Sequence, residues 1–198
     1  GAAFDLQGHR GARGLAPENT MSAFATACRL GVSTLELDTG VTRDGLLVVM
    51  HDPRLNPAIA RDERGEWVAP PGTPVQALTL AEVQRHDVGR LKPGTRYAQG
   101  FPDQQPVDGE RAPTLAAVLE RFGGVGSGAL RFNIETKLTP DEPTLTAAPE
   151  VFAKLLVEAL RRAGLTSRAT IQSFDWRTLR EAQRIAADIR TVALTSNP

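Results

Sequence analysis

Cysteine is almost absent from this chain of 198 residues, which has a single one, Cys28. One cysteine excludes an intrachain disulfide, and since Cys28 lies in a helical pattern we expect it to be a small buried apolar group. The chain also lacks a charge excess, because 23 basic residues balance 23 acidic ones. This balance argues against nucleic-acid binding, which favours a basic surface. No apolar run approaches the roughly 20 residues of a membrane span.

What is present is typical of a soluble globular domain. Hydrophobic residues make up 41% of the chain, and the mean hydropathy is -0.22. A chain of this length is most simply one domain over residues 1–198. The first residue is Gly1, so we expect a processing boundary upstream. A removed export signal would look the same, which favours a periplasmic location in a bacterium without deciding it. The oligomeric state is left open.

Strand and helix patterns alternate along most of the chain. Strands are predicted at residues 4–7, 32–41, 46–52, 129–137, 169–174 and 190–195. Helices are predicted at residues 20–30, 114–121, 149–163 and after Asp175, with Thr20 and Asp175 as caps and Gly31 and Gly164 as stops. The third strand is a continuous apolar run, which is typical of a buried parallel strand. The order favours an α/β fold with a mainly parallel sheet.

Residues 53–113 interrupt this alternation. Proline, glycine and charged residues are frequent there, and one helix is predicted, over residues 78–89. Thr79 and Glu82 have the spacing of a capping box at its start. Because a structureless loop of this length is improbable in a compact fold, we predict an inserted subdomain.

Polar side chains that are unusual for buried strands gather at one end of the predicted sheet. They follow or end the first four strands, and they are His9, Glu36, Asp38, His51, Glu135 and Lys137. The carboxyl ends of parallel strands lie at one edge of a sheet or barrel, where loops build active sites. We therefore expect these side chains to converge.

The strand period suggests a metal site. Glu36 and Asp38 are two residues apart and point to one face of the sheet, as do Glu135 and Lys137. Three unpaired carboxylates in an apolar setting are costly, and a divalent cation held by Glu36, Asp38 and Glu135 would remove that cost. All-oxygen ligation favours Mg²⁺ or Ca²⁺.

Each of these features also has a simpler interpretation. The His9–Arg10 pair either holds a surface loop or binds and attacks an anion, and acids two residues apart are common on solvated strand faces. The carboxylates would then pair with Arg10 and Lys137 without an ion. His51 would cap a turn. We assign only structural or packing roles to His86, Trp67, Trp176 and Tyr97.

The combined motifs resemble those of the glycerophosphodiester phosphodiesterase family. The matching pieces are His9–Arg10–Gly11, Pro17–Glu18–Asn19–Thr20, Glu36–Leu37–Asp38, Thr42–Arg43–Asp44–Gly45, His51–Asp52, Asn133–Lys137 and Gln172–Asp175. The match covers nearly the whole chain, with the insertion its least diagnostic part. The combined pattern is far more specific than any one piece.

The resemblance implies a TIM (β/α)₈-type barrel and a set of roles. It implies a divalent metal bound by Glu36, Asp38 and Glu135. It implies His9 and His51 as the general acid/base pair, with Arg10 and Lys137 on the phosphate. Phe174 is expected to line the pocket for the glycerol part of the substrate. The positions are those on which the strand pattern already converges.

The resemblance also implies a reaction on a small-molecule substrate. We expect metal-dependent hydrolysis of a glycerophosphodiester to glycerol 3-phosphate and an alcohol, with the neighbouring glycerol hydroxyl attacking first. Two alternatives stay open. One is a phospholipase-D-like enzyme of the same barrel group that acts on lysolipid or sphingolipid head groups. The other is a non-catalytic phosphodiester-binding module, which would have little use for two histidines that titrate near neutral pH.

The chain departs from the family at its end. A barrel needs eight strands and six are predicted, so two edges and part of the interior would stay open. We expect the native chain to continue past Pro198 with two more βα units of about 25–35 residues each. We also expect residues 1–198 alone not to be a self-sufficient enzyme.

Overall fold

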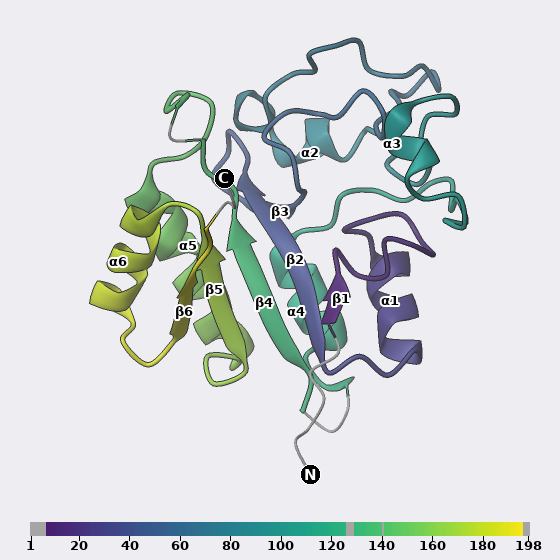
Figure 1. Ribbon diagram of the computed structural model, residues 1–198. Helices are drawn as coiled ribbons and strands as arrows, with labels where there is room; N and C mark the ends of the chain where they lie inside the picture. The colour runs from purple at the N-terminus through teal and green to yellow at the C-terminus, as the bar shows by residue number, and fades with distance from the viewer. Residues whose placement is uncertain (1–6, 126–128, 140, 196–198) are drawn as a thin grey trace.

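The computed structural model describes residues 7–125, 129–139 and 141–195, and Figure 1 shows one sheet flanked by helices. Five strands run parallel in the order β1, β2, β4, β5, β6. Their bounds are β1 Gln7–His9, β2 Thr34–Val41, β4 Arg131–Thr136, β5 Ala169–Ser173 and β6 Arg190–Ala193. The expected parallel α/β sheet is therefore confirmed. Residues 4–6 of the predicted first strand lie outside the described residues.

The third predicted strand is shorter than expected and runs the other way. It is β3, Leu47–Val49, and it pairs antiparallel with Thr39–Val41 of β2. The prediction of a parallel strand was wrong here because the Thr42–Gly45 turn, in which Gly45 adopts a φ of 79°, folds the chain back on β2 as a hairpin. Continuous burial of β3 looks the same in either direction. The described parallel sheet thus has five strands rather than six.

The helices between the parallel strands begin and end where capping predicts. They are α1 Met21–Arg29, α4 Leu115–Phe122, α5 Pro149–Ala163 and α6 Trp176–Ile185. The side chains of Thr20 and Asp175 accept backbone N–H groups at the starts of α1 and α6. Gly31 and Gly164 adopt positive φ just past the ends of α1 and α5.

The apolar core lies between the sheet and these helices. Leu35 and Leu37 on β2 and Phe132 and Ile134 on β4 are fully buried in one cluster with side chains of α1, α4 and α5. The residues that alternate with them in β2 are Glu36 and Asp38, which therefore face the other side of the sheet. The period of two separates an apolar face from an acidic one.

The segment between β3 and α4, for which we predict an inserted subdomain, lies over the carboxyl ends of β1 and β2 (Figure 1). It contains a 3₁₀ turn, Val75–Ala77, and two short helices, α2 Leu80–Val83 and α3 Arg96–Gln99. The capping box of Thr79 and Glu82 is confirmed. The helix predicted over residues 78–89 is wrong beyond Val83, because Asp87 pairs with Arg61 in an antiparallel bridge.

Among the described residues, no helix combines the length and the apolar character that a bilayer crossing requires.

Candidate active site

The strand register brings four candidate residues together. His9 is opposite Glu36 across β1 and β2, and Asp38 is opposite Glu135 across β2 and β4. Oxygen atoms of Glu36, Asp38 and Glu135 lie within 4.8 Å of one another, and all three residues are buried. Two like charges at this distance repel by about 3 kcal/mol at an effective dielectric constant of about 20. The three carboxylates therefore need cations.

Arg10 and Lys137 are the permanent cations nearest to this cluster. Lys137 Nζ lies 2.5 Å from Glu135 Oε2 and 3.7 Å from Asp38 Oδ1. Arg10 Nε lies 3.7 Å from Asp38 Oδ2, while its Nη1 donates to Glu18 Oε2 at 3.0 Å. With Glu18 included, four carboxylates surround these two cations, and the guanidinium of Arg13 acts on Glu18, Glu36 and Asp38 from further away.

Three of these carboxyl groups have raised pKa values. Burial, together with the charge of Asp38, raises the pKa of Glu36 to about 8. Burial also raises the pKa of Glu135, although Lys137 opposes the shift. Burial likewise raises the pKa of Glu18 against the influence of Arg10. The cluster is thus short of positive charge.

His9 projects from the end of β1 beside this cluster. Its Nε2 lies 3.6 Å from Glu36 Oε2, and its Nδ1 lies 3.2 Å from Nη2 of Arg13. The side chain is 58% exposed. Burial of the rest, followed by the charges of Arg13 and Arg10, lowers the pKa of His9. His9 is therefore neutral near pH 7.

His51 follows β3 and is oriented by its neighbour. Its Nδ1 lies 3.0 Å from Asp52 Oδ1, and Asn56 Nδ2 donates to Asp52 Oδ2 at 2.9 Å. These groups border a small cavity of about 30 Å³ that Glu18 and Asn19 also line. His51 is near enough to influence the pKa values of both His9 and Glu135, so the two histidines lie around one centre.

A strained turn holds the acidic residues in place. Arg10 and Asn19 adopt positive φ values of 51° and 53°, which non-glycine residues rarely do. The Arg10 N–H donates to Glu36 Oε2 at 2.9 Å, and Asn19 Nδ2 donates to Asp38 Oδ2 at 3.1 Å. Gly11 has a φ of 79°, and a Cβ there would lie 2.7 Å from that of Ala23. Only glycine fits this position.

Sequence reasoning missed three residues of the site. Glu18 and Asn19 belong to the quoted Pro17–Thr20 motif, but we gave them no role. Tyr97, to which we assigned only packing, donates its hydroxyl to Glu18 and accepts from Arg10 Nη1 at 3.1 Å. Glu18 and Asn19 could have been found, because both are polar residues inside a motif that we had already matched. Nothing in the sequence connects Tyr97 to residues some 80 positions earlier. Phe174 follows β5 and is 53% exposed, so its place in the pocket stays a prediction.

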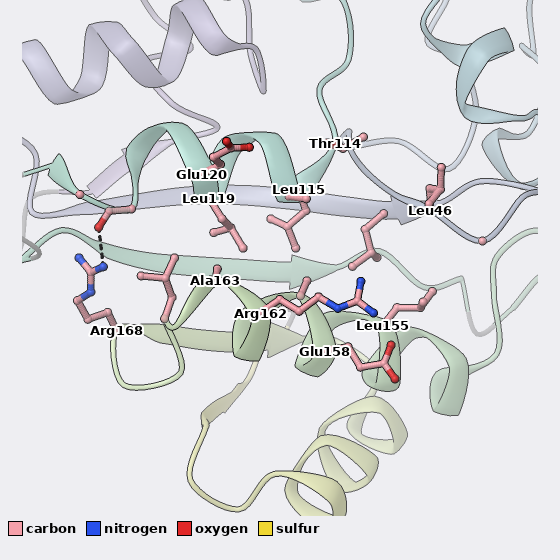
Figure 2. A pocket seen from close by; sticks show the side chains of 17 residues that line it. Leu46, Thr114, Leu115, Leu119, Glu120, Leu155, Glu158, Arg162, Ala163 and Arg168 are labelled. Atoms are coloured by element: carbon pink, nitrogen blue, oxygen red, sulfur yellow. Dashed lines mark hydrogen bonds between the residues drawn. The ribbon is translucent and has the colours of Figure 1, made fainter.

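A larger cavity lies elsewhere on the molecule. It has a volume of about 610 Å³ and is lined by residues of α4 and α5 on the helical side of the sheet. Figure 2 shows Leu115 and Leu119 of α4 facing Leu155 of α5 across it. None of the candidate residues lines this space. The chemistry-bearing side chains lie on the opposite face of the sheet.

The sequence profile of the Glycerophosphoryl diester phosphodiesterase family matches residues 9–198. The chain is 32% identical over 182 residues to a glycerophosphodiester phosphodiesterase of Caldanaerobacter subterraneus subsp. tengcongensis, covering 92% of this chain and 63% of that protein. A glycerophosphodiester phosphodiesterase of Bacillus subtilis is 30% identical over 194 residues, with 94% and 57% covered. The chain thus spans about three fifths of the length of these relatives.

Solved structures agree. A putative glycerophosphoryl diester phosphodiesterase from Silicibacter pomeroyi superposes with a TM-score of 0.92 at 36% identity, over 99% of this chain and 66% of that one. An Oleispira antarctica phosphodiesterase, solved with the product sn-glycerol-3-phosphate, has a TM-score of 0.72 at 23% identity, over 98% and 66%. These likenesses confirm the barrel-type α/β fold predicted from the sequence.

Proposed function

Because this chain belongs to the glycerophosphoryl diester phosphodiesterase family, we propose that it contributes the catalytic centre of an enzyme that hydrolyses glycerophosphodiesters to glycerol 3-phosphate and an alcohol. The observation that carries the proposal is the buried cluster of Glu36, Asp38 and Glu135, bordered by two histidines and two cationic side chains. Such a centre has groups to bind a phosphodiester and to move protons around it. The proteins from Caldanaerobacter and Bacillus subtilis bear this activity in their names.

The three carboxylates fit a divalent cation. Their donor set is all oxygen, as Mg²⁺ and Ca²⁺ prefer, and all three carboxyl groups are buried within reach of one point. A divalent charge would also offset the excess of carboxylates over the cations Arg10, Arg13 and Lys137. Glu36, Asp38 and Glu135 would hold the ion. When bound, it would supply Lewis-acid stabilisation of a phosphoryl oxygen.

Arg10 and Lys137 are placed to bind the phosphate. Both reach the edge of the carboxylate cluster, and their side chains are only 11% and 19% exposed. In this setting they would neutralise the charge that grows on the phosphoryl oxygens. Glu18 holds Arg10 in position, and the ionised guanidinium keeps donors free because it carries five N–H groups.

The partners of the two histidines suggest opposite roles. An arginine can only donate, so Arg13 makes His9 Nδ1 an acceptor and leaves the proton of neutral His9 on Nε2. An ionised carboxylate can only accept, so Asp52 keeps the proton of His51 on Nδ1 and leaves Nε2 free. His51 Nε2 would take the proton of the nucleophile, either water or the neighbouring glycerol hydroxyl. His9 Nε2 would give its proton to the leaving alkoxide as the P–O bond breaks. When water then opens the cyclic phosphate, it would return a proton to His9 Nε2, and His51 would pass the proton that it holds to the glycerol oxygen.

The test is an assay panel on the full-length protein. Glycerophosphocholine, glycerophosphoethanolamine and a lysophospholipid are offered with Mg²⁺, with Ca²⁺ and with a chelator. We expect turnover of the glycerophosphodiesters that the chelator abolishes and the metal restores. His9→Ala and His51→Ala should each lose about 10²–10⁴-fold in kcat. His86→Ala, whose ring contacts a backbone carbonyl of the insertion, is the matched control and should keep its activity.

Four outcomes would overturn parts of the proposal. Activity that persists in the presence of the chelator would contradict the proposed metal dependence. Near wild-type turnover by both histidine variants removes the acid–base assignment. Turnover of the lysophospholipid alone points to the phospholipase-D-like alternative, and binding without turnover to a phosphodiester-binding module.

A further inference from the structure

His9 has little around it to fix its ring. It ends a strand of three residues, more than half of its side chain is exposed, and its nearest acidic partner, Glu36, is 3.6 Å away. An exposed imidazole can turn about two side-chain torsions, so a catalytic orientation requires a partner. The close partner on its other nitrogen is Arg13, whose Nη2 lies 3.2 Å from Nδ1.

Arg13 is itself held by the insertion. Its guanidinium carbon lies 4.4 Å from the centre of the Phe101 ring, a cation–π distance, and its Nη1 lies 3.4 Å from the Tyr97 hydroxyl. Gln104 Nε2 donates to the Arg13 backbone carbonyl at 2.8 Å. The rings of Tyr97 and Phe101 also contact each other, with centres 5.5 Å apart. Three insertion residues thus contact one arginine.

We propose that Arg13 is a positioning residue for His9, and that the insertion acts on the reaction through it. Arg13 keeps the His9 proton on Nε2, facing Glu36 and the carboxylate cluster, and it stops the ring from flipping. Phe101, Tyr97 and Gln104 hold Arg13 in the conformation that does this. The inference deepens the proposed function and rests on it, because the Nε2 proton of His9 matters to the reaction only if His9 transfers it.

The direct test reads the tautomer rather than the activity. Nitrogen-15 NMR of the histidine rings is recorded on the full-length protein, with the His9 signals assigned by their loss in His9→Gln. We expect a protonated Nε2 and an unprotonated, hydrogen-bonded Nδ1. In Arg13→Met, which keeps an unbranched apolar stem and loses every donor, we expect a mixture of both tautomers. The signals of His51 and His86 should not move.

The kinetic test separates positioning from folding. On a glycerophosphodiester with an alkoxide leaving group, Arg13→Met should lose up to about 10²-fold in kcat, the cost of a misplaced catalytic group, with KM nearly unchanged. On a p-nitrophenyl diester, whose leaving group needs no proton, the loss should be much smaller. Arg13→Lys, which keeps a donor but not the planar face against Phe101, should recover part of the rate. Phe101→Leu should show a weaker form of the Arg13→Met defect.

Arg29→Met is the matched control. Arg29 ends α1 on the surface and donates to Thr26 Oγ1, so its loss should leave both readouts unchanged. The inference is overturned if wild-type His9 carries its proton on Nδ1, if Arg13→Met leaves the tautomer unaltered, or if the kinetic loss is equal for both leaving groups. Absence of turnover in the wild type would refute the proposed function, while the NMR result would still decide the role of Arg13.

Discussion

The sheet and the insertion both reach the candidate site, but they are built differently. The sheet and its helices share one continuous apolar cluster, in which Leu35, Phe132 and Ile134 are fully buried. The insertion packs around two smaller clusters of buried residues, one of which includes Val48 of β3. It relies more on hydrogen-bonded turns and on ion pairs such as those of Arg61 with Asp87 and Asp108. Partly exposed ion pairs of this kind contribute little stability each.

The difference separates two tasks. The buried strands hold the backbone of Glu36, Asp38 and Glu135 in a fixed register. A fixed register is needed because buried carboxylates are costly unless their partners stay in place. The insertion supplies Tyr97 and Phe101, which contact side chains of the turn after β1 rather than the carboxylates. The sheet therefore sets where charge is placed, and the insertion adjusts the groups around it.

The largest expected effect comes from the acids of the sheet. Asp38→Asn should lower kcat by at least about 10⁴-fold, because several kcal/mol of metal-derived stabilisation would be lost. Calorimetric titration should show Mg²⁺ binding weakened as well. Asp108→Asn, an exposed acid of the insertion paired with Arg90, is the matched control. Equal losses in both variants would contradict the division between sheet and insertion.

The second largest difference should be in the stability lost when a buried leucine is truncated in the sheet or in the insertion. Leu35→Ala in β2 and Leu55→Ala in the insertion remove the same atoms from sites that are both at most 2% exposed. Leucine truncations cost about 2–5 kcal/mol, and more where the surroundings cannot collapse. We expect Leu35→Ala at the upper end and Leu55→Ala at the lower end, measured by urea unfolding. The reverse order would show that the insertion is the more rigid packing unit.

The pH dependence of stability should follow Glu36. Since its folded pKa is about 8, above that of an unfolded glutamate, the folded protein keeps a proton that the unfolded chain releases. Stability without metal should therefore fall as pH rises from about 4.5 to 8. Glu36→Gln removes this loss and should be up to about 3 kcal/mol more stable at pH 7 by urea unfolding. Mg²⁺ should stabilise the wild type and not this variant.

Asp108 supplies the opposite case in the insertion. Arg90, then Arg61, hold its pKa below the usual value, so its contribution is present above the unfolded pKa and lost as pH falls through the folded one. Asp108→Asn should thus be slightly less stable than the wild type at pH 7. A gain in stability for Asp108→Asn, or no gain for Glu36→Gln, would contradict the opposite pH dependences that we expect for these two acids.

The smallest expected effect is that of the Tyr97 hydroxyl. Tyr97→Phe removes partners of Glu18 and Arg10 but leaves their ion pair. A hydrogen bond to a charged group contributes about 1.5 kcal/mol, which corresponds to roughly a tenfold change. Because Arg10 would hold the phosphate before and during reaction, most of the change should appear in KM, with a smaller loss of kcat because the same hydroxyl contacts Arg13. Trp67→Phe, which packs near Arg61 elsewhere in the insertion, should leave KM unaltered.

Local sequence rules were enough for much of the fold and for the acidic residues. The period of two placed Glu36, Asp38 and Glu135 on one face, and the caps Thr20 and Asp175 marked where helices begin. Burial alone did not reveal the direction of β3, since a buried strand has the same composition in either orientation. The length of α2 also escaped prediction, because pairing of Asp87 with Arg61 ends it from outside.

The amino-acid sequence by itself determined which residue types end each parallel strand, and hence that Glu36, Asp38, Glu135 and His9 meet at one edge of the sheet. It did so because side-chain direction and helix caps depend on neighbours a few positions away. Only the tertiary structure decided that Tyr97 and Phe101 contact Arg10 and Arg13. Such contacts join residues more than 80 positions apart, through a subdomain whose path depends on its own packing, and no local pattern encodes that path.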